Sequence, residues 1–95
     1  MNIIEVNPAD KPVSAKSIFK SEKSSVTAIQ ILEGELLKEH ITKEAALLVC
    51  VFGEVLFENE KGESHNLNAG DFITIEAMIK HWVKAIEASR LLLVK

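Results

Sequence analysis

The stretch AALLVCVFGEVLFENEKGESHNLNAGDFITI, residues 45–75, decides the fold of this chain. It opens with the continuous apolar run Ala45–Phe52, which is typical of a strand covered on both faces. Gly53 interrupts the run, and Glu54–Glu58 resumes extended character. Asn59–Gly62 then supplies hairpin-turn residues, because its last glycine accepts a positive φ at little cost. The stretch therefore predicts short strands joined by tight turns.

Strand signals continue on both sides of this stretch. Residues 33–43 favour a helix by propensity, but Gly34 and the dense flanking strands favour extended structure there. Strands at this spacing, with little helical periodicity between them, predict an all-β antiparallel sandwich or small barrel. The expected strands are Ser24–Leu32, Ala45–Phe52, Glu54–Glu58, Glu63–Leu67, Phe72–Ile75, His81–Ile86 and Arg90–Val94. The expected core residues are Ile29, Ile31, Leu48, Cys50, Phe52, Phe72, Ile73, Val83, Leu91 and Leu93.

The length and composition indicate one folded domain. A chain of 95 residues has room for a single core, so residues 1–95 are expected to form one domain. Apolar residues make up 47% and charged residues 26%, a globular rather than a disordered composition. Pro8 and Pro12 make residues 1–16 an irregular N-terminal lead-in, because proline lacks an N–H donor and restricts the residue before it.

Charge and cysteine usage exclude several partner classes. The net charge of −3 is opposite to that of a basic nucleic-acid-binding surface, so no nucleic-acid partner is expected. The longest uncharged apolar run, Ala45–Gly53, is far shorter than the roughly 20 residues that cross a bilayer, so no membrane partner is expected. The single cysteine, Cys50, excludes an internal disulfide, and no basic segment precedes an apolar stretch near Met1. We therefore predict a cytoplasmic protein. The four glutamates of residues 54–63 are typical of a solvated rim.

Two of the three histidines lie in spaced motifs. The first motif runs from Gly34 through five intervening residues to His40, and then to Thr42, Ala46 and Gly53. The second runs from Gly70 through five intervening residues to Glu76, and then to Met78, His81 and Ala85. This spacing resembles the motifs G-x5-H-x-H-x3-E-x6-G and G-x5-P-x-G-x2-H-x3-N of the cupin superfamily, in particular its small single-domain members. The third histidine, His65, matches no motif position and is expected at the surface.

The resemblance implies a fold and a place for the two histidines. It implies a single-domain cupin-type double-stranded β-helix, or jelly-roll, barrel. His40 and His81 should face one cavity and lie close together, although 41 positions separate them. In the cupin pattern, two histidines, a glutamate and a further histidine bind a divalent metal inside the barrel.

This chain departs from the pattern at the metal ligands. Thr42 stands in place of the second histidine, and Ala46 stands in place of the glutamate. Two imidazoles and a neutral hydroxyl supply no anionic ligand for a divalent cation. His40 and His81 remain candidate metal ligands, and Glu44 is the nearest carboxylate that would complete a site. No firm cofactor follows, and any divalent metal is expected to bind weakly.

The candidate ligand-binding residues are those that the resemblance directs toward the cavity. Met78 is expected to fill a gap near the barrel mouth. Cys50 shares its parity with Ala46 and is expected to point inward, as a buried thiol with a raised pKa and little reactivity. The complete expected set is His40, Thr42, Cys50, Met78 and His81.

Trp82 suggests how the chain assembles. If His81 faces inward, Trp82 faces the outside of its sheet, where a large aromatic is usually covered by another layer. Small cupins commonly dimerise through an outer sheet, so the resemblance implies a homodimer that buries Trp82. The alternative is a tryptophan packed under residues 13–20 of the same chain.

Three functions compete on the sequence alone. The favoured one is non-enzymatic binding of a small-molecule ligand in the barrel cavity. The second is a metal-dependent cupin enzyme of the oxygenase or isomerase type that uses His40 and His81. The third is an interaction module whose outer sheet is the functional surface. No general acid–base pair is evident, since the chain has no tyrosine and its carboxylates fall mostly in rim or turn positions.

Overall fold

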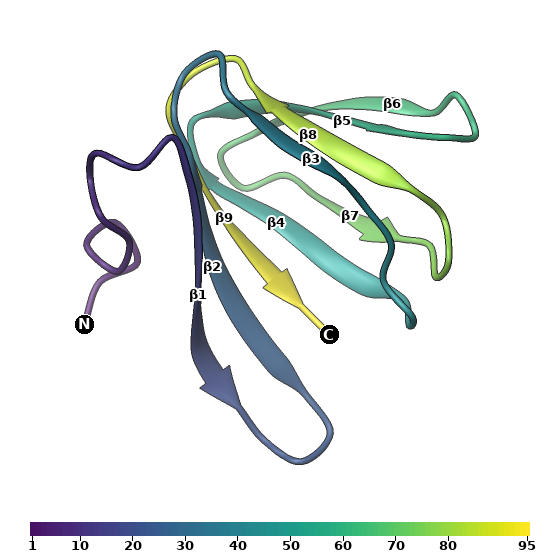
Figure 1. Ribbon diagram of the computed structural model, residues 1–95, viewed down its shortest axis with the longest axis horizontal. Coiled ribbons are helices and arrows are strands. Elements are labelled where there is room, and N and C mark those ends of the chain that lie inside the picture. The colour runs from purple at the N-terminus through teal and green to yellow at the C-terminus, as the bar shows by residue number, and fades with distance from the viewer.

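The computed structural model describes residues 1–95 and contains nine strands in two antiparallel sheets, with no helix (Figure 1). This confirms the all-β prediction. No helix in it is long and apolar enough to span a membrane. The strands are β1 Val13–Lys20, β2 Ser25–Ile31, β3 Leu36–His40, β4 Ala46–Phe52, β5 Glu54–Asn59, β6 Ser64–Asn68, β7 Phe72–Ile75, β8 His81–Ala85 and β9 Ser89–Val94.

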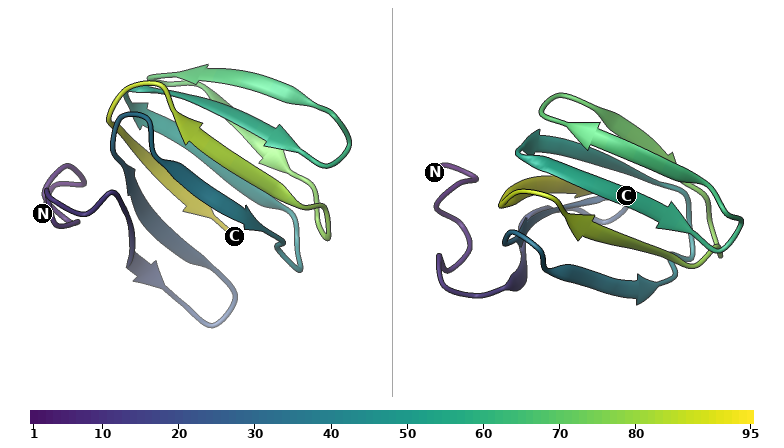
Figure 2. Two further views of the ribbon diagram at one scale, coloured as in Figure 1. Left: turned by 45° about the horizontal axis from the view of Figure 1, so that its top comes forward. Right: turned by 90° about the horizontal axis from the view of Figure 1, so that it is seen from above.

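The two sheets face each other across a single core. The five-stranded sheet, called sheet A, has the order β1-β2-β9-β4-β7, and the four-stranded sheet, called sheet B, has the order β3-β8-β5-β6. Figure 2 shows sheet B lying over one face of sheet A, with the N-terminal segment to one side. The chain alternates between the sheets, as in a double-stranded β-helix: β2 and β4 lie in sheet A, whereas β3 and β5 lie in sheet B.

Strand alternation fills the core from both sheets. In β4 the inward side chains of Ala46, Leu48 and Cys50 are buried, whereas Leu47 and Val49 between them are only half-buried. Thirteen buried apolar residues form one continuous cluster between the sheets. Seven expected core residues are confirmed as buried, namely Ile29, Ile31, Leu48, Cys50, Val83, Leu91 and Leu93.

Three expected core residues are not buried. Phe52 and Phe72 are 48% and 65% exposed, and Ile73 is only partly buried. Phe72 pairs with outward-facing Val49, so its side chain shares the outer face of sheet A. A register shift between Cys50 and Phe52 ends the regular alternation of β4. The continuous apolar run Ala45–Phe52 conceals this parity for Phe52. Phe72 lies outside that run, and its outward direction follows from its pairing with Val49.

The N-terminal lead-in is shorter than predicted. It is irregular only through Pro12, because β1 begins at Val13, which pairs with Ile31. The side-chain amide of Gln30 donates to the Pro8 carbonyl oxygen at 2.6 Å and to that of Lys11 at 3.2 Å. Residues 13–20 carry weak local strand signals and form a strand because they pair with β2. The prediction for residues 33–43 is confirmed, since β3 is extended.

Trp82 lies on the outer face of sheet B, as its alternation with His81 predicts. Its indole N–H donates to Glu58 Oε1 at 3.0 Å, and the residue is half-buried. The alternative cover by residues 13–20 is wrong, because that segment is β1 and pairs with β2 in sheet A. No strand of this chain covers Trp82 from outside sheet B.

Gly53 allows the chain to cross from sheet A to sheet B. Its φ is +92°, and a Cβ atom at this position would overlap Ser89 Oγ and the Ala88 carbonyl oxygen. Ser89 Oγ also accepts a hydrogen bond from the backbone N–H of Glu54 at 3.1 Å. The bend between β4 and β5 therefore requires a residue without a side chain.

We expect Gly53→Ala to destabilise the protein by about 2–4 kcal/mol, because it adds backbone strain and a steric overlap. Gly62→Ala is the matched control, since Gly62 has a φ of +83° but open space around its Cα. It should cost only about 1 kcal/mol. Urea unfolding of both variants measures the difference. Equal losses would show that packing against Ser89 does not restrict this bend.

Candidate functional site

The candidate site is a pair of histidines on neighbouring strands of sheet B. His40 ends β3 and His81 begins β8, and the two residues are paired across the strands. Their Nε2 atoms are 3.2 Å apart and their ring centroids are 4.3 Å apart. His81 is 1% exposed, whereas His40 is exposed. The predicted close approach of the two imidazoles is confirmed. We call the barrel end at which they lie the histidine end.

Backbone carbonyls fix the protonation of both rings. Nδ1 of His40 is 3.1 Å from the Lys38 oxygen, and Nδ1 of His81 is 3.2 Å from the Ile79 oxygen. A carbonyl oxygen only accepts hydrogen bonds, so both Nδ1 atoms must be the donors. In neutral rings each Nε2 is then an unprotonated lone-pair nitrogen, and the two lone pairs converge. One added proton between the two Nε2 atoms would form a hydrogen bond that joins the rings.

Burial decides which ring stays neutral. Desolvation lowers the pKa of His81, the bond to Ile79 opposes this effect, and the charge of His40 lowers the pKa further. Phe57 stacks beside His81, with ring centroids 5.7 Å apart and planes at 23°. The buried His81 ring therefore favours its neutral form.

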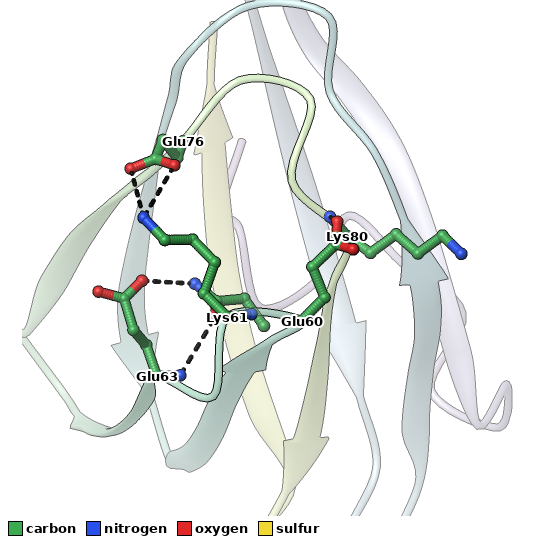
Figure 3. Close-up of polar contacts among 6 residues, drawn as sticks. Glu60, Lys61, Glu63, Glu76 and Lys80 are labelled. Atoms are coloured by element: carbon green, nitrogen blue, oxygen red, sulfur yellow. Dashed lines mark hydrogen bonds and ion pairs between the residues drawn. The ribbon is translucent and has the colours of Figure 1, made fainter.

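The hairpin between β5 and β6 holds the turn that leads to His81 (Figure 3). Lys61 Nζ lies 3.2 Å from the carboxylate of Glu76, and the backbone N–H of Lys80 donates to Glu60 Oε2 at 2.6 Å. Glu63 accepts a hydrogen bond from the Asn59 amide at 2.7 Å, which lowers the pKa of this carboxyl together with the nearby Lys61 charge. These carboxylates are engaged in shaping the hairpin and the turn.

Thr42 lies at the same end of the barrel and is 3% exposed. Its hydroxyl has no hydrogen-bond partner, and its backbone oxygen accepts the Met78 N–H at 2.8 Å. A buried hydroxyl without a partner is uncommon, because desolvation costs about 1–3 kcal/mol. It is one of four buried side-chain polar atoms in the chain that have no hydrogen-bond partner.

Met78 does not fill a gap in the barrel mouth. It is 61% exposed and has a φ of +64°. The cupin pattern has glycine at this position, and the chain keeps that left-handed backbone conformation with a methionine. The methionine side chain is therefore turned toward solvent, which corrects the packing role expected from the sequence.

The residues present do not fit the metal centre of the cupin pattern. A separation of 3.2 Å lets both Nε2 atoms reach one ion at about 2.0–2.1 Å. A catalytic site typically needs a third protein ligand. Ala46 is packed in the core, and Glu44 is exposed on the rim. No group of three or more His, Cys, Asp or Glu side chains is placed to hold a metal ion.

A groove of about 470 Å³ opens beside the histidine end. Thr42, Lys43 and Glu44 line one side, and the turn between β1 and β2 together with Lys95 lines the other. Neither His40 nor His81 lines it. Thr42 and Glu44 therefore line the groove, and the two histidines lie outside it.

Cys50 is a core residue, as predicted. It is 0% exposed, and its Sγ lies 3.7 Å from the carbonyl oxygens of Phe52 and Gly53. Burial raises the pKa of the Cys50 thiol, and the charges of Asp71 and Glu54 add to the rise, while the Phe52 bond opposes it. Its polar partners belong to the bend after β4 and not to the histidine pair. His65 is exposed on β6, also as predicted.

The fold and the spacing of the site define the class of protein to which this chain is similar. A cupin superfamily protein from Desulfitobacterium hafniense matches 98% of this chain and 84% of its own, at 14% identity and a TM-score of 0.86. An RmlC-like cupin from Desulfovibrio desulfuricans matches 99% and 92%, at 18% identity and a TM-score of 0.85. KdgF from a Halomonas species matches 93% and 82%, at 18% identity and a TM-score of 0.79. At these identities the likeness shows the fold: the chain is a small domain with the cupin double-stranded β-helix.

Sequence comparison adds no relative beyond these structures. A scan against protein-family models finds no match. A search of curated proteins also finds none. The strand pattern predicted an all-β fold, and the motif spacing was the only sequence signal of the cupin class. No motif position marks Phe57 or the two carbonyl oxygens that orient the histidine rings, so sequence reasoning missed them.

We expect stability to fall as the pH drops below about 6.5, the unperturbed pKa of histidine. The pKa of His81 is lowered in the folded state, so the unfolded state binds a proton first and gains stability. The loss continues down to the lowered pKa of the folded protein. Urea midpoints between pH 7.5 and 5 measure it. His81→Gln should flatten this dependence and His65→Gln should not; an unchanged slope in His81→Gln would contradict the assignment.

The Cys50 thiol should be unreactive in the folded protein, because it is buried and its pKa is raised. Labelling with a thiol-specific disulfide reagent at pH 8 should proceed only as fast as the protein opens. Full labelling should follow in denaturant. A stoichiometric fast reaction in native buffer would show that the β4 bend exposes the sulfur.

Proposed function

We propose that the protein is a non-enzymatic binding module that holds a small polar ligand at the histidine end of its barrel. The observation that carries the proposal is the His40–His81 pair with its converging Nε2 atoms, 3.2 Å apart. One ring is exposed and the other is buried, so a ligand reaches the pair from the His40 side and competes there for the two Nε2 atoms that face each other. The unpartnered Thr42 hydroxyl offers a further hydrogen bond.

The apolar packing of the barrel interior supports a ligand site at the end of the barrel rather than deep inside it. Thirteen packed apolar side chains occupy the space between the sheets, including Leu48 and Phe57. Phe57 stacks against the inner side of His81. A polar ligand therefore finds its partners at the histidine end, where polar side chains and water meet. This moves the expected ligand position outward from the barrel cavity.

The engagement of the titratable groups favours binding over catalysis. A general acid or base must lie within hydrogen-bond reach of the reacting atoms, and the Nε2 atoms of the two histidines face each other instead. The carboxylates of Glu60, Glu63 and Glu76 bind backbone, amide or ammonium groups of the hairpin and the turn. No third His, Cys, Asp or Glu joins the histidines. The pair can exchange one proton and donate or accept hydrogen bonds.

A metal-dependent enzyme of the oxygenase or isomerase type is the second candidate. One observation favours it: the two Nε2 lone pairs converge at a separation that suits a shared divalent ion. Such a site would have two neutral protein ligands and no anion to offset the ionic charge. Its affinity should therefore be low, with water completing the coordination sphere.

Metal analysis of protein purified without an affinity tag separates the two functions. We expect a metal content far below one ion per chain, equal in the wild type and in the His40→Ala, His81→Ala double variant. Neutral, paired imidazoles without an anionic partner predict this result. A near-stoichiometric metal that disappears in the double variant would favour the enzyme instead.

A direct binding test uses the imidazole signals. Small hydroxy acids and monosaccharides serve as probes, and the ring resonances of His40 and His81 are followed by NMR. A probe that binds should shift both resonances and leave those of exposed His65 unchanged, with at least tenfold weaker binding in His40→Ala. Binding with equal affinity in that variant would remove the histidine pair from the site.

A further inference from the structure

The groove beside the histidine end is lined almost entirely by polar and charged residues. Its volume is about 470 Å³, and Ile41 is its only apolar lining residue. This volume falls within the range of small-molecule pockets, roughly 300–1,000 Å³. In Figure 1 the turn between β1 and β2, the C-terminal end of the chain and the connection between β3 and β4 all lie toward the lower end of the molecule. Three segments that are far apart in the sequence therefore meet around this groove.

Lysines give the groove a positive charge within an acidic protein. Four lysines and two glutamates line it, so its formal charge is +2, whereas the whole chain carries −3. A terminal carboxylate on Lys95 would still leave the groove positive. We call it the lysine groove, and its lysines are Lys20, Lys23, Lys43 and Lys95.

The groove lysines are not paired with the groove glutamates, Glu22 and Glu44. The only ion pair of the chain joins Lys61 and Glu76, and neither of these residues lines the groove. All four groove lysines are exposed, with Lys43 on one side of the groove and the other three on the opposite side. Unpaired cations on both sides of a groove attract an anion to the space between them.

Thr42 supplies an unused hydrogen-bond donor in the wall of the lysine groove. Thr42 is 3% exposed, and its buried hydroxyl has no hydrogen-bond partner in the chain. An anionic oxygen bound against Thr42 would accept a hydrogen bond from this hydroxyl. Hydrogen bonds to charged groups are stronger than those between neutral groups. The hydroxyl therefore points to an anion independently of the lysines.

Hydrogen bonds hold the hairpin side of the groove in place. The hydroxyl oxygens of Ser21 and Ser24 lie 2.9 Å apart, and the backbone N–H of Ser21 donates to the Ser24 carbonyl oxygen at 2.8 Å. The backbone N–H of Ser25 donates to the Lys95 oxygen at 2.7 Å. The turn and the last residue are thus joined before any ligand binds, which reduces the entropy cost of binding.

We propose that the lysine groove binds the phosphate group of a small phosphorylated molecule. Lysine ammonium groups bind phosphate as point charges, and hydroxyl groups donate to its oxygens. The serines and glutamates of the groove suit the hydroxyl groups of a polar body such as a sugar. Neither His40 nor His81 lines the groove, so this site is separate from the proposed ligand site and shares only Thr42 with it.

The distribution of charge favours a small ligand over a nucleic acid or an anionic membrane. The chain contains 11 basic and 14 acidic side chains, and the groove takes four of the former and only two of the latter. Acidic side chains therefore predominate outside the groove. An extended polyanion would be repelled there, whereas a small anion meets only the groove itself.

Titration followed by NMR tests the site, with inorganic phosphate and glucose 6-phosphate as probes and sodium chloride at matched ionic strength as the reference. The backbone amide signals of Ser21, Ser24 and Lys43 should shift with both phosphates. Glucose 6-phosphate should bind more tightly than inorganic phosphate, and glucose alone should leave these signals unchanged. The affinity should fall as salt is added, because the lysines are exposed to solvent.

A pair of double variants tests the charge. Lys20→Gln with Lys43→Gln should weaken phosphate binding about tenfold, because two cations are lost from opposite sides of the groove. Lys16→Gln with Lys84→Gln is the matched control, since both lysines are exposed and lie outside the groove. This control should bind as the wild type does. Equal weakening in both double variants would reduce the effect to net charge and overturn the proposal.

Thr42→Val tests the hydroxyl, because valine keeps the shape of threonine and removes its donor. Phosphate binding should weaken about tenfold. The urea midpoint of the free protein should stay the same or rise, because an unpartnered buried hydroxyl is lost. A purely structural role for Thr42 would lower the urea midpoint and leave phosphate affinity unchanged, and that result would contradict its place in the site.

His40→Ala separates this site from the proposed ligand site, and it should bind phosphate as tightly as the wild type. Phosphate binding that shifts the ring signals of His40 and His81 and disappears in His40→Ala would move the anion to the histidine pair and overturn the groove site. So would a wild type that binds vesicles of phosphatidylcholine and phosphatidylglycerol but neither soluble phosphate. A failure of hydroxy acids and monosaccharides to bind the histidine pair would leave the phosphate result standing.

Discussion

The pairing of β4 with β9 is the constraint on which the rest of the structure depends. Their register places Leu48 opposite Leu93 and Cys50 opposite Leu91 on the inward side, at the centre of the core. The same register places Leu47, Val49, Leu92 and Val94 on the outside of sheet A. Because strand side chains alternate, a slip of one residue would exchange the core for the outer face. At Gly53 the chain then bends from β4 of sheet A into β5 of sheet B, where Ser89 leaves no room for a side chain.

Sequence reasoning recovered the elements that have a strong local or motif signal. Strand alternation and glycine spacing predicted most strands, and the spacing of His40 and His81 predicted their contact. The errors arose where tertiary partners decide the outcome. β1 exists because β2 pairs with it, and Phe72 faces outward because Val49 does. Neither of these two strand pairings can be read from the order of residues in the sequence alone.

The histidine pair shows a balance between desolvation and hydrogen bonding. Burial favours a neutral His81, yet carbonyl oxygens hold protons on both Nδ1 atoms. The two Nε2 atoms consequently face each other without a proton of their own. In the cupin pattern a cation and an acidic ligand occupy such a position. Here Ala46 supplies no charge, so the same backbone arrangement leaves a polar, proton-sharing contact.

The two sheets divide the chemistry of the chain between them. Sheet B carries the histidine pair and the hairpin that supports it, with Glu58 and Lys84 on its solvated outer side. Sheet A turns the apolar side chains of Val49, Phe72 and Leu92 away from sheet B. His40 lies on sheet B and Phe72 lies on sheet A, so the histidine pair and this apolar face are separate features of the molecule.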